Sequence, residues 1–310
     1  MSNRIGFIDV DGHGYPNLAI MKLSAWHKSH GDTTGFANPL ESYDKVYMSK
    51  VFTFTPDYPY TWDCETEKGG TGYLDYTKVL PEEVEHTCPD YLLYGIDDVA
   101  YGFTTRGCIR HCPFCLVHDK EGMIREHADL DEFLGGRKNV VLMDNNIVAH
   151  DHGIRQLEKC RERKIAVDCN QGIDARIVYK SEYLIDLLSS IKVYGRSGIR
   201  FACDDKSEII PCQKAVDKIL ERNPKAIFSI YCILTDDYND SLKRVMLWRK
   251  YGHIVCVYAP PYRNFSNPNQ VIPQWQKDMA RWANNRILYY STEWENYMKT
   301  KKEEQEETLF

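Results

Sequence analysis

The sequence predicts an α/β protein: an incomplete β/α barrel of six strand–helix units, preceded by a small, incomplete doubly wound α/β domain. Two observations predict this fold class. From residue 98 onward, short apolar runs alternate with amphipathic helical patterns, and the later runs recur roughly every 25–35 residues, the length of one strand–helix unit. The residues before 97 follow a different pattern. The chain has 310 residues, enough for a sizeable core in one large domain or two modest ones.

Six apolar, β-prone runs are the expected strands of the barrel. They are VAYGF (99–103), NVVLMD (139–144), IAVDC (165–169), IRFAC (199–203), AIFSIYCIL (226–234) and HIVCVYA (253–259). Continuous apolar runs of this kind are typical of parallel strands buried on both faces. The segments between them, such as SEYLIDLLSSI and NDSLKRVMLWRKYG, have the periodicity of amphipathic helices. Six such units make a partial version of the eight-unit barrel.

The N-terminal region has fewer and less regular elements. RIGFIDV, YDKVYMSKVFTF and DYLLYG are expected strands, and NLAIMKLSAWHKSHG is an expected helix that ends at Gly31. The segment 55–80, rich in Pro, Gly, Asp and Tyr, is expected to be a loop. The predicted domains are 1–96 for the small α/β domain, 97–262 for the barrel, and 263–310 for a C-terminal helical closing segment with a charged tail.

Composition restricts the class of protein. The formal net charge of −6 argues against a strongly basic protein that coats nucleic acid, although a local basic patch stays open. The first residues, MSNRIGFIDVDGHG, lack the regions of a secretory signal, and no apolar run is long enough to span a membrane. The odd number of cysteines, eleven, favours reduced thiols. We expect a cytoplasmic protein without a membrane partner.

Three cysteines lie close together in the stretch TTRGCIRHCPFCLVHDKEG. Cys108, Cys112 and Cys115 have the spacing C-x3-C-x2-C. A structural zinc site needs four ligands, usually as two separated pairs, and only His111 and His118 lie near enough in sequence to be a fourth ligand. A cubane iron–sulfur cluster ordinarily takes four thiolates, so three leave one iron open to a small molecule. Use of the cluster for electron transfer alone requires a fourth protein ligand.

The stretch RGCIRHCPFC resembles the cluster loop of the radical S-adenosylmethionine (radical SAM) superfamily, including the aromatic Phe114 before the third cysteine. In that family the loop follows the first strand of a partial β/α barrel, as it follows VAYGF here, and the resemblance covers residues 98–260. It implies a [4Fe-4S] cluster on the three cysteines, with SAM bound to the open iron. One electron, from a reductant such as flavodoxin or ferredoxin, then cleaves SAM to a 5′-deoxyadenosyl radical that abstracts hydrogen from a substrate.

The resemblance also points to the residues that follow the second strand, MDNN. The family often has a Gly-Gly-Glu-like run here that binds the methionyl ammonium of SAM. Asp144, Asn145 and Asn146 depart from that run, but their carboxylate and amide oxygens accept the same N–H groups. For Asn146, an Asx turn that closes the strand is the alternative.

Polar residues also follow the third and fourth strands, where barrel sites gather. In DCNQGIDAR, Asn170 and Gln171 are expected to contact substrate or cofactor. Arg176 either pairs with the SAM carboxylate or forms an ion pair with Asp174.

In FACDD, Asp204 is expected to bind the ribose hydroxyls of SAM, as a polar residue at this strand end does in the family. Asp205 is an alternative for that role, or else a helix cap, and TDDYND after the fifth strand is expected to cap a helix. The resemblance places Phe114 beside the adenine.

The remaining cysteines do not suggest a second cluster. Cys169, Cys203, Cys232 and Cys256 each lie in or directly after a separate expected strand, where a thiol packs as a small hydrophobe. The roles of Cys64 and Cys88 stay open.

The segment DVDGHGYPNLAIMKLSAWHKSHG resembles the opening of the cobalamin-binding-type domain found in front of some radical SAM barrels. Asp11, Gly12 and His13 match a pattern in which the histidine ligates cobalt, but Pro16 stands where a glycine completes it. The resemblance implies a short, degenerate relative of that domain. If it binds cobalamin, His13 is the axial ligand and the protein is a cobalamin-dependent methyltransferase. Otherwise the domain shapes the substrate entrance.

The segment after residue 260 bears on the substrate. It is rich in Trp, Tyr, Asn and Arg, which can stack on and hydrogen-bond a base, or simply cover the open side of the barrel. The transfer RNA methylthiotransferases share the cysteine loop but need an auxiliary cluster and a basic RNA-binding module, which we do not find here. We expect a small-molecule or nucleotide substrate, with modification of a nucleobase or nucleotide as the first candidate and nucleic acid as an open partner.

Overall fold

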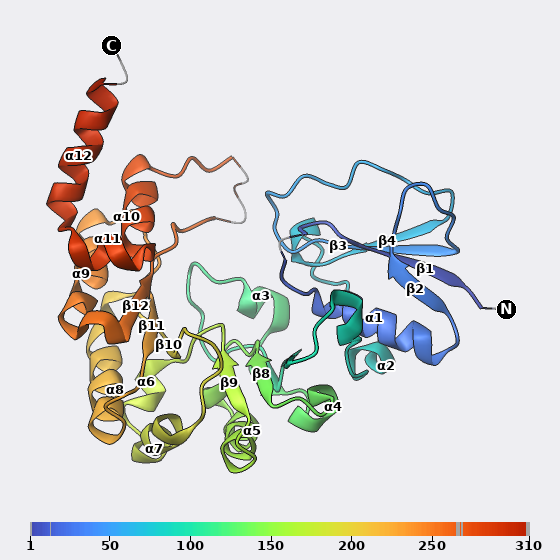
Figure 1. Cartoon of the computed structure of the whole chain (residues 1–310), viewed down its shortest axis with the longest axis horizontal. Coiled ribbons are helices and arrows are strands. Elements are labelled where there is room, and N and C mark those ends of the chain that lie inside the picture. The colour runs from blue at the N-terminus through green and yellow to red at the C-terminus, as the bar shows by residue number, and fades with distance from the viewer. Residues whose placement is uncertain (1, 13, 265–266, 268, 308–310) are drawn as a thin grey trace. The chain divides into compact units, whose positions relative to one another are not determined.

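The computed structural model is an α/β structure that describes residues 2–12, 14–264, 267 and 269–307, without the side chains of 302–307 (Figure 1). The chain divides into two compact units. Unit 1 comprises Met1–Phe103 and Ala128–Val140, and unit 2 comprises Thr104–His127 and Val141–Phe310.

Unit 1 contains a four-stranded parallel sheet with the order β2-β1-β3-β4. Its elements are β1 (Arg4–Asp9), α1 (Leu18–Ser29), β2 (Thr33–Phe36), β3 (Lys45–Ser49), β4 (Glu65–Gly69), η1 (Thr71–Tyr73), α2 (Glu82–Glu85), η2 (Tyr91–Tyr94), β5 (Val99–Gly102) and α4 (Leu130–Leu134). The crossover helix α1 begins where the Asn17 side chain accepts a hydrogen bond from the amide of Ile20.

Both faces of this sheet are buried, but by different kinds of structure. On one face, Ile5 and Phe7 of β1 pack with Ile20 and Leu23 of α1. On the other, Ile8, Val46 and Met48 pack with aromatic side chains of the long segment between β3 and β4, Tyr58 and Trp62. A loop thus covers the face on which a complete doubly wound domain carries helices.

Two of the expectations for unit 1 are wrong, and one strand was not expected. The segment 55–80 contains strand β4, whose residues Glu65–Gly69 are mostly exposed and so carry no apolar pattern. Thr33–Phe36 forms the unexpected edge strand β2. DYLLYG is not a strand, because Tyr91–Tyr94 forms the 3-10 helix η2. It buries Tyr91 while leaving Leu92 exposed.

Unit 2 holds the remaining elements, and its strands and helices alternate as expected. They are β6 (Thr105–Arg106), α3 (Val117–Glu121), β7 (Arg125–Glu126), η3 (Ile147–Ala149), α5 (Asp151–Glu162), β9 (Ala166–Cys169), α6 (Ala175–Val178), α7 (Glu182–Ser190), β10 (Ile199–Ala202), η4 (Lys206–Glu208), α8 (Ile209–Arg222), β11 (Phe228–Tyr231), α9 (Tyr238–Met246), η5 (Leu247–Ile254), β12 (Val255–Tyr258), α10 (Gln274–Asn284), α11 (Arg286–Ser291) and α12 (Trp294–Glu307). The boundary between the units falls inside β8 (Asn139–Leu142). Each of the six expected barrel strands contains an observed strand.

These strands belong to two three-stranded sheets, with the orders β5-β8-β9 and β10-β11-β12. The second is parallel throughout. Its core is formed by Phe201, Phe228 and Ile230, all fully buried. The short strands β6 and β7 pair antiparallel with one another.

The C-terminal helices α10, α11 and α12 pack on the last part of unit 2. Trp282 of α10 is fully buried against Tyr289 of α11 and Trp294 of α12, with ring centroids 5.1 and 5.4 Å apart. Most of the aromatic side chains expected to stack on a base are therefore in the core of this segment.

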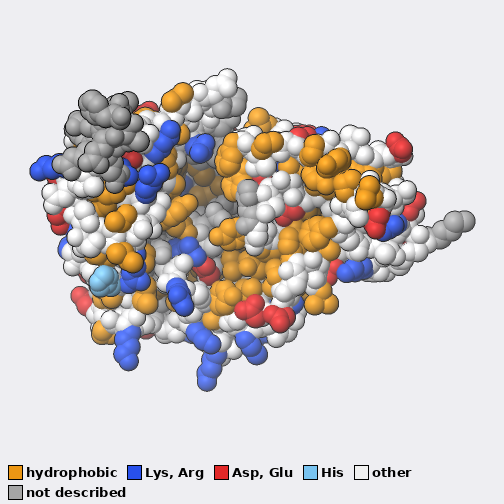
Figure 2. Space-filling view, turned by 45° about the horizontal axis from the view of Figure 1, so that its top comes forward, with side chains coloured by type: hydrophobic (Ala, Val, Ile, Leu, Met, Phe, Trp, Pro, Cys, Tyr) orange, Lys and Arg blue, Asp and Glu red, His pale blue; other side chains and the backbone are white. Residues whose placement is uncertain are grey.

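The visible face in Figure 2 carries both basic and apolar side chains. Several of its Lys and Arg side chains stand apart from one another along the lower edge (Figure 2). In unit 1, Phe52 and Phe54 are exposed and stack with ring centroids 5.2 Å apart. None of the helices in the described part of the chain is long and apolar enough to cross a membrane.

Candidate functional site

The three cysteines lie on one loop that is closed at its base. β6 and β7 pair Thr105 with Glu126 and Arg106 with Arg125, so the intervening residues form a single excursion that includes α3. Gly107 opens this loop with φ of +79°, and a Cβ there would lie 2.4 Å from the carbonyl oxygen of Met123. Only glycine fits this close approach without a shift of the backbone.

Glu121, at the end of α3, holds the loop from the inside. Its carboxylate accepts hydrogen bonds from the Gly107 amide at 2.9 Å and from Asn145 Nδ2 at 3.0 Å. It also pairs with Arg106 at 3.2 Å. Asn145, an expected cofactor ligand, therefore contacts the cysteine loop through Glu121.

Asp144 holds the same loop from the end of β8. It is 2% exposed, and its Oδ1 accepts hydrogen bonds from the backbone amides and hydroxyls of both Thr104 and Thr105. Burial raises the pKa of Asp144, while these hydrogen bonds act in the opposite direction. The expected ligand Asp144 is thus placed beside the loop, with its Oδ1 directed to the start of the loop.

Two of the three sulfur atoms accept hydrogen bonds. Cys108 Sγ accepts from the Arg110 amide at 3.4 Å and from Asn146 Nδ2 at 3.8 Å, and Cys115 Sγ accepts from the Val117 amide at 3.5 Å. Such N–H donors stabilise negative charge on sulfur, as a metal-bound thiolate requires.

Asn146 has a buried polar atom that lacks a hydrogen-bond partner. The residue is 2% exposed, and its Oδ1 atom is buried without a hydrogen-bond partner, although its Nδ2 atom contacts Cys108. An unsatisfied buried carbonyl costs roughly 1–3 kcal/mol. A donor that binds beside Cys108 would therefore recover this energy.

No single-ion metal site is formed by the described side chains: no group of three or more His, Cys, Asp or Glu is arranged to hold one metal ion. A cubane cluster binds each thiolate at a different iron, so the three cysteines need not converge on one point. The rings of the two histidines of the loop, His111 and His118, are in contact, with centroids 3.5 Å apart and planes tilted by 38°.

A cavity of about 490 Å³ opens beside the cysteine loop. Cys112 and Phe114 line one side of it, and the residues that follow β10 and β11 line the other. Its polar walls carry both signs of charge, from Arg110, Arg176, Lys206, Asp204, Asp205, Glu208, Asp237 and Asp240. The volume is in the range of small-molecule and cofactor sites.

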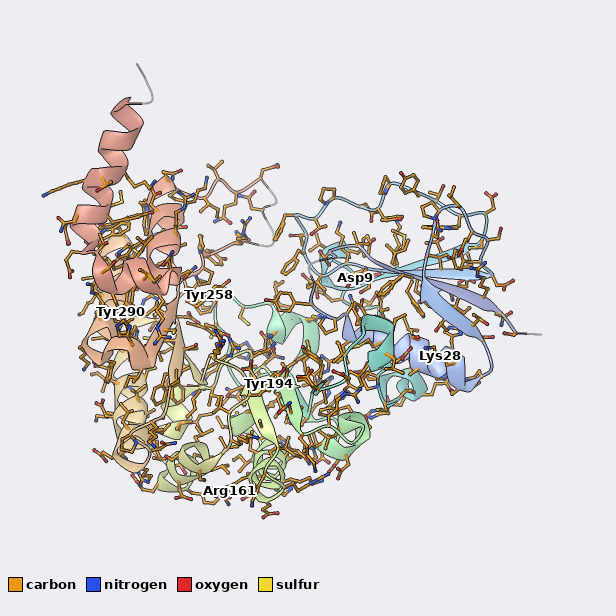
Figure 3. All side chains as sticks on the ribbon, in the orientation of Figure 1. Asp9, Lys28, Arg161, Tyr194, Tyr258 and Tyr290 are labelled. Carbon is orange, nitrogen blue, oxygen red and sulfur yellow. The ribbon has the colours of Figure 1, made fainter. Side chains whose placement is uncertain are left out.

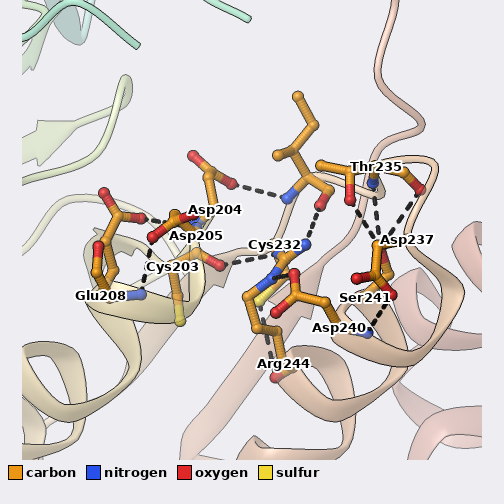
Figure 4. Close-up of polar contacts among 12 residues, drawn as sticks. Cys203, Asp204, Asp205, Glu208, Cys232, Thr235, Asp237, Asp240, Ser241 and Arg244 are labelled. Atoms are coloured by element: carbon orange, nitrogen blue, oxygen red, sulfur yellow. Dashed lines mark hydrogen bonds and ion pairs between the residues drawn. The ribbon is translucent and has the colours of Figure 1, made fainter. Parts of the chain in front are cut away.

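Two carboxylates that line this cavity, Asp204 and Glu208, belong to the polar contacts drawn in Figure 4. Asp204 Oδ1 accepts a hydrogen bond from the Ile233 amide at 2.7 Å, and its Oδ2 makes none with the described residues. Burial raises the pKa of Asp204 to about 6. Burial likewise raises the pKa of Glu208 to about 7, although Arg176 opposes this shift.

Arg176 forms the ion pair with Asp174 that the sequence left as one alternative. Its Nε lies 2.8 Å from Asp174 Oδ1, and its Nη1 lies 2.9 Å from Glu208 Oε1. Arg110 of the cysteine loop also pairs with Asp174, at 2.8 Å. Burial disfavours ionisation of Asp174, but the two arginines outweigh it and lower its pKa. This network ties the loop to the wall of the cavity.

Asp237 caps a helix, as expected, and Asp205 caps one as well, which is one of the two alternatives left open for it. Asp205 accepts from the Ser207 amide at 2.8 Å in a capping box with Glu208. Asp237 accepts from the Asp240 amide at 2.9 Å at the start of α9.

Asn170 and Gln171 lie next to the end of β9. Gln171 Nε2 donates to Asn170 Oδ1 at 3.2 Å, and the Asn170 backbone carbonyl accepts a hydrogen bond from the Tyr231 hydroxyl at 2.7 Å. The sequence interpretation missed Tyr231 and the ion pair between Asp168 and Arg200 beside it. The sequence does indicate this ion pair, because Asp168 interrupts the apolar strand IAVDC and Arg200 interrupts the apolar strand IRFAC.

The other cysteines do not form a second metal site within the described residues. Cys203 and Cys232 are fully buried, as expected, whereas Cys169 and Cys256 are partly exposed. Hydrogen bonds from the thiols of Cys212 and Cys232 lower the pKa of Cys203 to about 5. His13, the expected axial ligand of cobalamin, lies outside the described residues.

A scan of protein-family models finds no match to this chain, and no curated protein is a significant match.

Two glycines of the loop provide a matched test of its geometry. Gly107→Ala should lower the free energy of unfolding by about 2–4 kcal/mol, because a left-handed φ is combined with a backbone clash. Gly122 also has a positive φ, +72°, but a Cβ there meets no atom within 4 Å. Its ψ of −152° completes a backbone conformation that is essentially restricted to glycine, so Gly122→Ala should cost about 1–3 kcal/mol from the backbone alone, less than Gly107→Ala with its added clash. Equal losses in urea unfolding would contradict the close packing of the loop base.

Proposed function

We propose that the chain is a radical SAM enzyme in which Cys108, Cys112 and Cys115 hold a [4Fe-4S] cluster and leave its fourth iron for SAM. The observation that carries this proposal is the unpartnered Oδ1 of Asn146. This oxygen is buried, and the Nδ2 of the same side chain contacts Cys108. The loop of Cys108 also carries Cys112, which lines a cavity of about 490 Å³. A thiol-rich loop, a buried acceptor and a cofactor-sized space are the parts such an enzyme needs.

The residues present fit the cluster. Three thiols lie on one closed loop, and backbone and side-chain N–H groups point at two of the sulfur atoms. When bound, such a cluster supplies the electron that cleaves the sulfonium of SAM, and an external reductant such as flavodoxin or ferredoxin restores it.

Asn146 would bind the methionyl end of SAM. Its Oδ1 accepts an N–H from the ammonium group, which satisfies the buried carbonyl, while its Nδ2 keeps its contact with Cys108. Asp144 and Asn145 would support the site without binding SAM themselves. Asp144 holds the cysteine loop through Thr104 and Thr105, and Asn145 holds it through Glu121.

The cavity would bind the nucleoside end of SAM. Asp204 Oδ2, which has no partner among the described residues, accepts the ribose hydroxyls, and Phe114 packs by the adenine. The carboxylates Asp204 and Glu208 also favour the positive sulfonium when they are ionised. Arg176 is already paired with Asp174 and Glu208, so its role is to orient the wall of the cavity.

The finer fold proposed with this function is a partial (β/α)6 barrel of radical SAM type. Support comes from the six strands in the expected order and from the polar residues that closely follow β5, β8, β9 and β10, at the strand ends where barrel enzymes place their sites. A small-molecule or nucleotide substrate is part of the same proposal.

Cys112→Ala tests the cluster directly. The full chain, reconstituted anaerobically with iron and sulfide and reduced with dithionite, should form 5′-deoxyadenosine from SAM, measured by mass spectrometry. Cys112→Ala should lower this product at least about a hundredfold, because it removes one of three cluster ligands. The matched variant Cys88→Ala removes an exposed thiol in unit 1 and should retain the product.

The proposal fails if the wild type binds zinc and no iron, or if Cys112→Ala forms 5′-deoxyadenosine at the wild-type rate.

The raised pKa of Asp204 predicts that SAM binding depends on pH. Because its pKa is raised to about 6, its carboxylate is ionised at pH 8 and becomes protonated as the pH falls through 6. Loss of the charged acceptor should weaken SAM binding by about 3–10-fold between pH 8 and 5. Asp204→Asn should bind more weakly at pH 8 and show a smaller change with pH, measured by equilibrium dialysis. An unchanged pH profile in this variant would remove Asp204 from the site.

A further inference from the structure

The sheet β10-β11-β12 has two chemically different faces. Because successive residues of a strand point to opposite sides, its register defines rows across the sheet. The rows of one face are Ile199–Phe228–Val255 and Phe201–Ile230–Val257, all buried and apolar. The rows of the other face are Arg200–Ser229–Cys256 and Ala202–Tyr231–Tyr258.

The second face ends in a pair of tyrosines. Tyr231 and Tyr258 are the last residues of β11 and β12 and are register partners, with ring centroids 5.7 Å apart at an interplanar angle of 68°. Tyr258 is 51% exposed. Figure 3 shows it on the opposite side of β12 from Tyr290, whose hydroxyl donates to the Val255 carbonyl. The ring of Tyr258 thus offers an open aromatic surface at the carboxyl end of the sheet.

The charge on this face is neutralised internally. Arg200 makes two hydrogen bonds to Asp168, at 2.6 and 2.5 Å. A third, at 2.8 Å, goes to the hydroxyl of Tyr231, which in turn donates to the backbone carbonyl of Asn170. The guanidinium is therefore not available to pair with a phosphate, and the tyrosine ring is held in place.

Two residues with side-chain amides, Asn170 and Gln171, follow β9 at the hydroxyl end of Tyr231, which donates to the backbone carbonyl of Asn170. In the pair Asn170–Gln171, one bond joins Gln171 Nε2 to Asn170 Oδ1. Asn170 Nδ2 and Gln171 Oε1 make no hydrogen bond with the described residues. They provide one donor and one acceptor, the combination with which amides recognise the edge of a base.

We infer that this face binds a neutral, planar heterocycle of the nucleobase kind, stacked on Tyr258 and read at its edge by Asn170 and Gln171. This inference rests on the proposed function, in which the heterocycle belongs to the substrate. It places the stacking surface on β11 and β12. It does not use the C-terminal aromatics Trp282, Tyr289 and Trp294, which are buried.

The test uses the full chain with its reconstituted cluster and saturating SAM. Guanosine, cytidine and uridine are the probes, and adenosine is left out because the proposed SAM site would also bind it. At least one nucleoside should bind, and Tyr258→Ala should weaken that binding about tenfold or more, because one stacked base is lost. Tyr258→Phe keeps the ring and should bind nearly as well. Ribose 5-phosphate, which has no base, should not bind.

Tyr183→Ala is the matched control, since Tyr183 is 46% exposed on α7, away from the strand ends. It should leave nucleoside binding unchanged. Binding of no nucleoside by an enzyme that cleaves SAM would overturn this inference alone. Nucleoside binding that is unchanged in Tyr258→Ala would also overturn it. If SAM is not cleaved but nucleoside binding depends on Tyr258, the binding face stands and the proposed function fails.

Discussion

The cysteine loop depends on one buried carboxylate, Asp144. Asp144, which follows β8, accepts hydrogen bonds from the amides and hydroxyls of Thr104 and Thr105. These bonds fix the position at which the loop begins. Burial raises the pKa of Asp144, and the hydrogen bonds from Thr104 and Thr105 offset only part of that shift. Glu121 then closes the loop from its far end. Two carboxylates thus position three thiols before any metal binds.

The loop in turn creates an asymmetric environment for a ligand. On the side of Cys108 lies the unsatisfied carbonyl of Asn146, and on the side of Cys112 lies a cavity with ionisable walls. An ammonium donor suits the first and a cationic nucleoside suits the second, and SAM carries both in one molecule. The sheet face with Tyr231 and Tyr258 is different, because its charges cancel. In the proposed enzyme, the two regions would thus select cofactor and substrate by different chemistry.

Features that leave a local pattern in the sequence could be predicted, whereas features that depend on contacts between distant residues could not. Apolar strands such as Phe228–Tyr231 were predictable, because burial leaves a local pattern. The exposed edge strand Glu65–Gly69 was not, because its stability comes from backbone pairing with β3. In the site, the three cysteines were evident from their spacing, whereas the hydrogen bonds of Asp144 and Glu121 link residues up to 40 positions apart. The pairing of Arg176 required the same three-dimensional information.

The vacant fourth iron is the central claim, and electron paramagnetic resonance of the reduced, reconstituted chain tests it most directly. With SAM labelled with oxygen-17 in its carboxylate, we expect the cluster signal to shift and to show hyperfine coupling to the label, because the methionyl group binds the open iron. An unchanged spectrum at saturating SAM would mean that the fourth iron already has a ligand from the protein, and would contradict the account.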